Sequence, residues 1–150
     1  MFTSDCWEFL CCADASGKGQ FPPLGRGFTP ERRKRSVLIV DDEHLIADTI
    51  AEILNDSGFE AVAVYDGAAA LERTREGCPD SLIADVIMPS MNGIDLAKRV
   101  KQDCPDTKIF LFSGQAATAD LLERARAQGY VFELLAKPLR PEILLKKLAA

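Results

Sequence analysis

The chain of 150 residues is 47% hydrophobic and 27% charged, which is enough apolar material for one globular domain with a core. No apolar run approaches the ~20 residues that a membrane-spanning helix needs. The charge is uneven, because residues 1–35 hold six Lys/Arg and four Asp/Glu, whereas residues 36–150 hold 12 and 19. This acidic body is not expected to attract nucleic acid by itself, and the lack of a long apolar run predicts no membrane partner.

Residues 1–35 are predicted to form a flexible extension, and residues 36–150 a folded domain. Glycine and proline recur from residue 17 to residue 30, and a charge run precedes the domain. The first residues lack the basic region of a signal peptide, and their apolar stretch is too short for one. A cytoplasmic location is therefore expected by default. An odd number of cysteines without a C-x-x-C pair argues against a disulfide framework and a zinc site. We therefore expect reduced thiols at Cys6, Cys11, Cys12, Cys78 and Cys104.

The folded part begins with two strand-helix units. The run Val37–Val40 is entirely apolar, which is typical of a strand buried on both faces, and His44–Ser57 carries apolar residues at helical spacing. A second strand is predicted at Ala61–Tyr65. Asp66 then offers an N-cap for a helix over residues 67–76. Parallel pairing of the two strands is expected, because a helix connects them.

Two further units are each introduced by Cys-Pro-Asp, at residues 78–80 and 104–106. The first leads into the apolar strand Ser81–Asp85, and the second into a strand predicted over residues 108–112. A helix is predicted over residues 94–102 between them. The pair Asn92-Gly93 is expected to supply the positive φ needed to turn into that helix.

The last elements are a helix at Thr118–Gln128, a strand at Val131–Ala136 and a closing helix at Pro141–Leu148. Five buried strands that alternate with five helices predict a doubly wound α/β fold around a parallel sheet. In such folds the ligand site lies beyond the carboxyl ends of the strands.

Polar side chains follow four of the five predicted strands at that edge: Asp41, Asp42, Asp85, Ser113 and Lys137. Three carboxylates brought together repel one another, so they require a cation, and oxygen ligands favour Mg²⁺. A carboxylate beside Mg²⁺ and a lysine can attack a phosphoryl group, because both cations neutralise its oxygens. The expected product is an aspartyl phosphate on Asp85, with Ser113 hydrogen-bonded to a phosphoryl oxygen.

Each of these residues also has a simpler interpretation when it is taken alone. Asp41 and Asp42 could cap the following helix, Ser113 could be an ordinary turn residue, and Lys137 could be an exposed charge. All of them at one edge of the sheet favour a functional site. His44, next to the acids, is expected to be an exposed residue of the first helical turn.

The chain resembles the receiver domain of two-component response regulators. The resemblance rests on VLIVDDE at residues 37–43, DVIMPSMNG at 85–93, Ser113 after KIFLF, and Lys137-Pro138. It implies a flavodoxin-like five-stranded sheet in the order 2-1-3-4-5. It also implies that the Lys137-Pro138 peptide bond is cis, which aims the lysine into the site.

The resemblance further implies a role for each acid. Asp85 would be the phosphoacceptor, Asp42 would bind Mg²⁺ directly, and Asp41 would assist through water. The backbone carbonyl of Ile87 would complete the protein ligands of the metal. The phosphoryl donor would be a phosphohistidine on a sensor kinase or phosphotransfer protein, and the domain would act as a switch through binding to a further protein, not as an enzyme.

Two positions depart from the pattern of the family. Leu134 stands three residues before Lys137, where members usually carry Tyr or Phe, and Phe132 could take that role through a bulge. Ile87 is an apolar residue two positions after Asp85, with Gln115 as its polar counterpart, so an altered phosphate lifetime is expected without a stated sign.

Two other functions remain open at this point. One is a receiver-like interaction module that never carries phosphate, and the unusual Leu134 favours it. The other is a Mg²⁺-dependent phosphohydrolase, although such enzymes usually carry a second acid where this chain has Ile87. Because nothing follows the last predicted helix, no output domain is expected and a single-domain receiver is favoured.

Overall fold

The computed structural model describes residues 33–114 and 118–149. From Lys34 onward these residues belong to one compact unit. Nearly all of the predicted extension, with Cys6, Cys11 and Cys12, lies outside the described residues, as does Gln115. Strands and helices alternate in the order β1 (Ser36–Val40), α2 (His44–Asp56), β2 (Glu60–Val64), α3 (Gly67–Glu76), β3 (Ser81–Asp85), α4 (Gly93–Asp103), β4 (Lys108–Ser113), α5 (Thr118–Ala127), β5 (Glu133–Ala136) and α6 (Pro141–Ala149).

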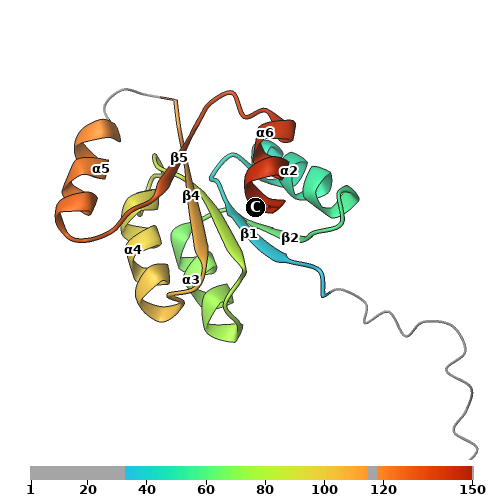
Figure 1. The fold of residues 1–150 in the computed structure, drawn as a ribbon, viewed down its shortest axis with the longest axis horizontal. Helices are drawn as coiled ribbons and strands as arrows, with labels where there is room; N and C mark the ends of the chain where they lie inside the picture. Colours follow the sequence, from blue (N-terminus) through green and yellow to red (C-terminus); the bar gives the residue numbers. More distant parts are fainter. Residues whose placement is uncertain (1–32, 115–117, 150) are drawn as a thin grey trace, which may run out of the picture. The chain divides into compact units, whose positions relative to one another are not determined.

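The five strands form one parallel sheet in the order β2-β1-β3-β4-β5 (Figure 1). This confirms the predicted class and strand order. The central strand β3 is buried at every position, including the polar residues Ser81 and Asp85 at its two ends. The elements lie close to their predicted bounds, except that β5 begins at Glu133 and not at Val131.

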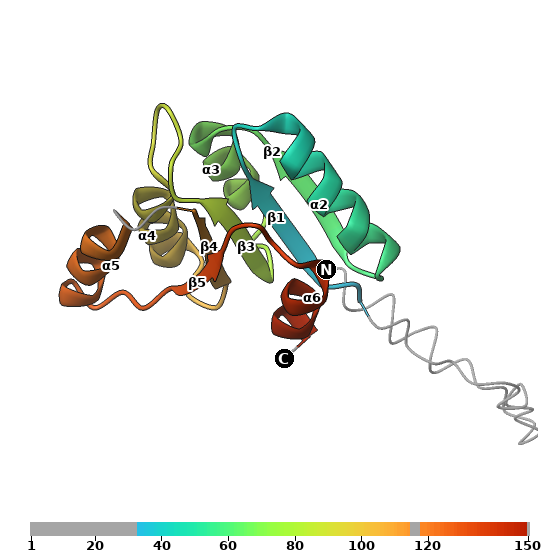
Figure 2. The same ribbon diagram turned by 90° about the horizontal axis from the view of Figure 1, so that it is seen from above.

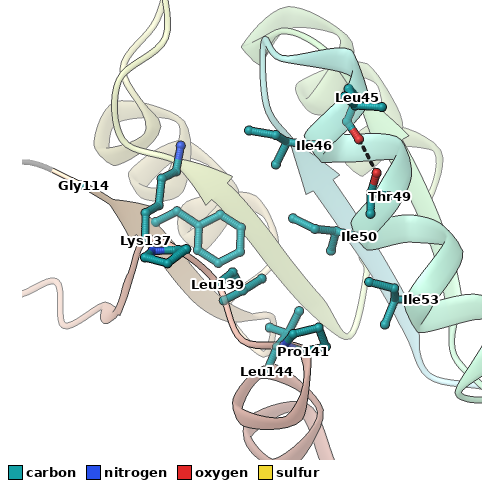
Figure 3. A pocket seen from close by; sticks show the side chains of 12 residues that line it. Leu45, Ile46, Thr49, Ile50, Ile53, Gly114, Lys137, Leu139, Pro141 and Leu144 are labelled. Carbon is teal, nitrogen blue, oxygen red and sulfur yellow. Dashed lines mark hydrogen bonds between the residues drawn. The ribbon is translucent and has the colours of Figure 1, made fainter.

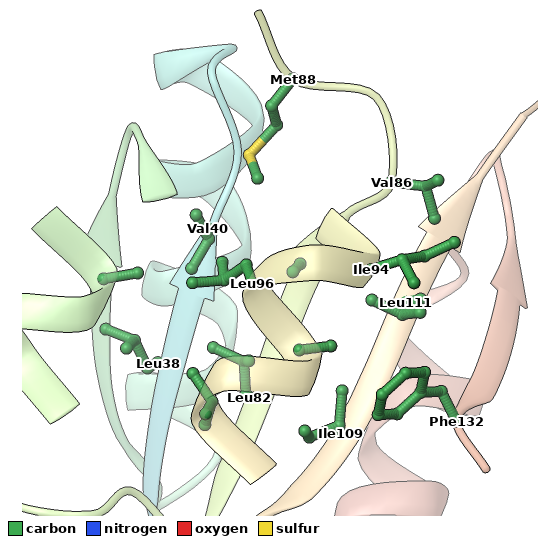
Figure 4. Close-up of a cluster of buried hydrophobic side chains, with 14 of the residues drawn as sticks. Leu38, Val40, Leu82, Val86, Met88, Ile94, Leu96, Ile109, Leu111 and Phe132 are labelled. Atoms are coloured by element: carbon green, nitrogen blue, oxygen red, sulfur yellow. The ribbon is translucent and has the colours of Figure 1, made fainter. Parts of the chain in front are cut away.

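Alternate residues of the strands feed two apolar cores, one on each face of the sheet. Leu38 and Val40 of β1 pack with α3, α4 and α5, and this core is drawn in Figure 4. Val37 and Ile39 pack on the other face with α2 and α6. Figure 2 shows α2 and α6 on the opposite side of the sheet from α3 and α4. Such two-sided burial covers both faces of the sheet and leaves the ends of its strands accessible to ligands.

The expectation of reduced thiols is wrong for two of the cysteines, because Cys78 and Cys104 form a disulfide with their Cα atoms 5.6 Å apart. The physical reason is the sheet order. Strands β3 and β4 are neighbours with Ser81 paired to Lys108, so the two Cys-Pro-Asp turns that precede them lie side by side. Sequence spacing alone did not reveal this pair, since 26 residues separate the two cysteines.

The turn into α4 also differs from its prediction. Asn92 has an extended backbone and caps the helix through its Oδ1, which accepts a hydrogen bond from the Asp95 backbone at 2.8 Å. Among the described glycines, positive φ occurs at Gly58 and Gly129, beyond the ends of α2 and α5, and not at Gly93. The chain therefore enters α4 through an N-cap and not through a left-handed residue.

None of the helices in the described ranges is both long and apolar enough to cross a membrane.

Candidate functional site

The carboxyl ends of four neighbouring strands bring the predicted site residues to one edge of the sheet. Asp41 directly follows β1, and its backbone N–H donates to Val64 at 3.2 Å. Asp85 and Ser113 are the last residues of β3 and β4. Lys137 follows β5, and its backbone N–H donates to the Ser113 carbonyl at 3.2 Å. Residues far apart in the sequence thus meet because their strands are parallel.

Three carboxylates form the centre of this site. One oxygen from each of Asp41, Asp42 and Asp85 lies within 4.8 Å of the others. Asp41 and Asp85 are buried, whereas Asp42 is more exposed to solvent. Asp41 Oδ1 accepts a hydrogen bond from the Glu43 backbone at 3.0 Å, but its buried Oδ2 has no hydrogen-bond partner among the described residues. A buried acceptor without a partner indicates a place for a cation or a donor.

Lys137 supplies a positive charge to the carboxylates. Its Nζ lies 2.9 Å from Asp85 Oδ2 and 4.0 Å from Asp41 Oδ2. Burial by itself would lower the pKa of Lys137, but the hydrogen bond to Asp85 and the nearby acids raise it overall. The ammonium is therefore held in its charged form beside Asp85.

One lysine does not neutralise three carboxylates. Burial raises the pKa of Asp41, and the charges of Asp85 and Asp42 add to this rise, although the Glu43 hydrogen bond and Lys137 oppose it. The cluster consists of oxygen donors, and the described residues around it contribute no His or Cys ligand. This donor set fits a hard divalent cation such as Mg²⁺ and does not fit a soft metal.

Gly93 and Ile87 shape the loop beside Asp85. A Cβ on Gly93 would lie 2.1 Å from the Asp85 carbonyl oxygen, so only glycine allows α4 to start this close. The Ile87 backbone N–H donates to Asp85 Oδ1 at 3.2 Å, while its side chain is 51% exposed at the mouth of the site. The role of its carbonyl as a metal ligand stays a prediction.

The residues proposed to transmit a signal occupy different environments. The Lys137-Pro138 bond is cis, as expected. Leu134 lies on β5 opposite Leu111 and is 43% exposed. Phe132 is buried in the core before β5 begins (Figure 4), and the pairing of β4 with β5 runs without a bulge. Phe132 therefore lies in the core. The strand position three residues before Lys137, where family members usually carry Tyr or Phe, is occupied by Leu134.

An apolar groove next to the acidic site was not predicted from the sequence. It measures about 770 Å³ and is lined by α2, α6 and the segment that follows β5. Figure 3 shows Ile46, Ile50 and Ile53 of α2 facing it, with the Lys137 ammonium pointing away from Leu144. Lys137 lines this groove, but none of the described acidic residues does, so the three carboxylates lie beside the groove and not in it.

Residues 37–149 match the family model of the response regulator receiver domain. The chain belongs to this family, whose members are signalling modules of two-component systems. The five-stranded fold and the acidic edge described above agree with this membership. The roles of the individual site residues stay predictions.

Among known proteins, the chemotaxis protein CheY of Thermotoga maritima is 31% identical over 115 residues, which cover 76% of this chain and 94% of that protein. The DNA-binding response regulator MtrA of Mycolicibacterium smegmatis is 29% identical over 119 residues, covering 78% of this chain and 50% of MtrA. The chain thus spans about half the length of the MtrA relatives that it matches.

Solved structures give the same result. The chemotaxis response regulator CheY4 of Vibrio cholerae has a TM-score of 0.67 and 31% sequence identity, with 77% of this chain and 97% of that chain covered. The response regulator TrrA of Thermotoga maritima, solved in complex with Mg²⁺-BeF, has a TM-score of 0.67 and 27% identity, with 77% and 96% covered.

Proposed function

We propose that this chain is a phosphorylation-controlled switch of a two-component phosphorelay. Asp85 accepts a phosphoryl group from the phosphohistidine of a sensor kinase or phosphotransfer protein. The observation that carries this proposal is the Lys137 ammonium, 2.9 Å from Asp85 Oδ2 within a cluster of three carboxylates. A lysine in this place neutralises charge both before and during phosphoryl transfer.

Mg²⁺ would be held by Asp41, Asp42, Asp85 and the backbone carbonyl of Ile87. Bound there, the ion supplies the additional positive charge that an incoming phosphoryl group needs. Asp41 Oδ2, which accepts no hydrogen bond from the described residues, and the all-oxygen donor set support this assignment. The Mg²⁺-BeF complex of TrrA is consistent with it.

The output of the switch is proposed to be binding to another protein, in the cytoplasm, without direct contact to nucleic acid or membrane. Val131, Leu134 and Ile143, near or on β5 and α6, are exposed apolar residues that a partner could cover. The same exposure of Leu134 favours the second candidate, an interaction module that never carries phosphate. A phosphorylation experiment separates the two functions.

The test is incubation of the protein with Mg²⁺ and acetyl phosphate, followed by intact mass measurement. The expected result is one added phosphate, which is lost when Asp85 is replaced by Asn or when EDTA removes the metal. Absence of label on the parent protein would favour the interaction module. Label that persists in Asp85→Asn would overturn the assignment of the phosphoacceptor.

A matched control is Asp56→Asn, because Asp56 is an exposed acid at the end of α2, outside the site. This variant is expected to accept phosphate at the rate of the parent. The third possibility, a phosphohydrolase, predicts continuous turnover of a phosphate ester such as p-nitrophenyl phosphate. We expect no such turnover, so the chain would work as a switch and not as an enzyme.

A further inference from the structure

The Cys78–Cys104 disulfide lies at the amino ends of β3 and β4, at the opposite edge of the sheet from the acidic site. Its two halves differ in access, since Cys78 is exposed and Cys104 is only 2% exposed. Thiol–disulfide exchange requires a thiolate to reach one of the two sulfur atoms. Access therefore selects Cys78 as the sulfur that is attacked.

A cavity of about 240 Å³ adjoins Cys78 and gives an attacking molecule room to approach. Its charged lining residues are Arg73 and Glu60, one of each sign, so it does not select for the charge of a thiol. A small thiol of low molecular weight fits this opening. Cys104 is not among the described residues that line this cavity, so the cavity gives access to Cys78 and not to Cys104.

Noncovalent contacts hold the two cysteine-bearing turns together independently of the disulfide. Thr107 Oγ1 donates to the Pro79 carbonyl at 2.7 Å, and the Lys108 backbone N–H donates to Asp80 at 3.1 Å. Within the Cys104 turn itself, Lys101 Nζ donates to the Thr107 carbonyl at 2.9 Å. After reduction these contacts keep the two thiols near each other, which gives them a high effective concentration for re-forming the bond.

The disulfide also fixes one end of α4. Cys104 is the residue at which this helix stops, and its backbone N–H donates to Val100 at 2.7 Å. The other end of α4 starts at Gly93, against the Asp85 backbone. A change of redox state at Cys104 therefore acts directly on the last turn of a helix whose first turn adjoins the acidic site.

We propose that Cys78–Cys104 is a reversible redox site, that a small thiol attacks it at Cys78, and that opening it loosens the last turn of α4. A thiolate forms a bond to Cys78 Sγ while the bond to Cys104 breaks, and Cys104 leaves as a thiolate that takes up a proton. A second thiolate attacks the sulfur of the attached molecule and releases Cys78. Two thiols are thereby oxidised to a disulfide while the protein disulfide gains two electrons.

The test uses the full chain with Cys6, Cys11 and Cys12 replaced by Ser, so that one pair remains. The protein is treated with a limiting amount of reduced glutathione, quenched in acid and mapped by peptide mass spectrometry. The expected first product carries glutathione on Cys78 and a free thiol on Cys104. Glutathione found on Cys104, or a reduced protein that does not re-form the pair with glutathione disulfide, would overturn the proposal.

Hydrogen exchange tests the effect on α4 without any further substitution. We expect faster exchange of the amides near Val100–Cys104 in the reduced protein, and unchanged exchange in α2. Equal exchange of these amides in both redox states would contradict the loosening of α4. None of these measurements depends on phosphorylation of Asp85.

Two single variants on the same background serve as a matched pair, with folding checked by circular dichroism. In Cys104→Ala the free Cys78 is expected to react rapidly with iodoacetamide under native conditions, because its residue is exposed. In Cys78→Ser the free Cys104 is expected to react many-fold more slowly. Equal rates in two folded variants would refute the assignment of the attacked sulfur.

Discussion

The two oxygens of Asp85 have different partners. Oδ1 accepts the Ile87 backbone N–H at 3.2 Å, and Oδ2 is paired with Lys137 at 2.9 Å. Phosphorylation of either oxygen would therefore exchange one of these contacts for contacts to the phosphoryl group. Two residues beside these contacts are therefore chosen for substitution: Ile87 itself, and Asp41, which lies near Lys137.

Ile87→Asn is expected to shorten the lifetime of the phosphorylated protein by a few fold. The Ile87 side chain is 51% exposed beside Asp85 and offers no hydrogen bond to a water molecule there. An amide in its place could hold a water near the phosphoryl group. Loss of the added phosphate with time, followed by intact mass after removal of acetyl phosphate, measures the effect. Decay kinetics equal to those of the parent would contradict it.

Asp41→Asn is expected to raise the free energy of unfolding at neutral pH in EDTA, by about 1–3 kcal/mol, because its buried Oδ2 accepts no hydrogen bond from the described residues. Burial raises the pKa of Asp41, so the protonated carboxyl favours the folded state at low pH and this contribution is lost as the pH rises. The advantage of Asn should therefore shrink as the pH falls toward 3.8, the ordinary value.

Urea denaturation at several pH values measures this advantage of Asn. The more exposed Asp42 provides the control, since Asp42→Asn should gain less stability than Asp41→Asn. Added Mg²⁺ should stabilise the parent more than Asp41→Asn. If Asp41→Asn is less stable than the parent at neutral pH in EDTA, the Asp41 carboxylate does not destabilise the metal-free fold.

At the scale of elements, the start of α4 depends on the close approach of Gly93 to the end of β3. Gly93→Ala is expected to lower the free energy of unfolding by about 1–3 kcal/mol, because its Cβ would meet the Asp85 carbonyl oxygen at 2.1 Å. The same shift should slow phosphorylation of Asp85. The control is Gly77→Ala, where φ is 177° and no atom of the described residues lies within 4 Å of the added Cβ.

Urea denaturation of both glycine variants measures the difference. Gly77→Ala should change stability by no more than about 0.5 kcal/mol. Similar losses in the two variants would show that contact with the Asp85 carbonyl does not decide the cost.

The strands and the acidic edge were predictable because local sequence encodes them. Apolar runs such as Val37–Val40 mark buried strands, and parallel strands place their terminal residues at one edge. The N-cap at Asp66 was likewise predictable, and its side chain accepts the Ala69 N–H at 2.7 Å.

The Cys78–Cys104 pair was not predictable, since it depends on which strands become neighbours and not on spacing. The groove between α2 and α6 depends on helix packing, which no local pattern specifies.

At the scale of the whole molecule, the disulfide closes a loop that contains β3, the segment after Asp85 and α4. Chain entropy for a separation of 26 residues gives a stabilisation of about 3.5 kcal/mol relative to the reduced chain. Dithiothreitol should therefore lower the free energy of unfolding by this order, as measured by urea denaturation. Cys78→Ser should show no further loss on reduction. If dithiothreitol still lowers the free energy of unfolding of this variant, the stabilisation comes from other cysteines.

The complete burial of β3 has a further consequence for how the molecule opens. Amide protons at Leu82, Ile83 and Ala84 are shielded by neighbouring strands on both sides and by a core on each face. Such protons become accessible to solvent chiefly when the entire sheet separates. Their exchange rate in native buffer thus measures the global unfolding equilibrium, without denaturant, on the strand that ends in Asp85.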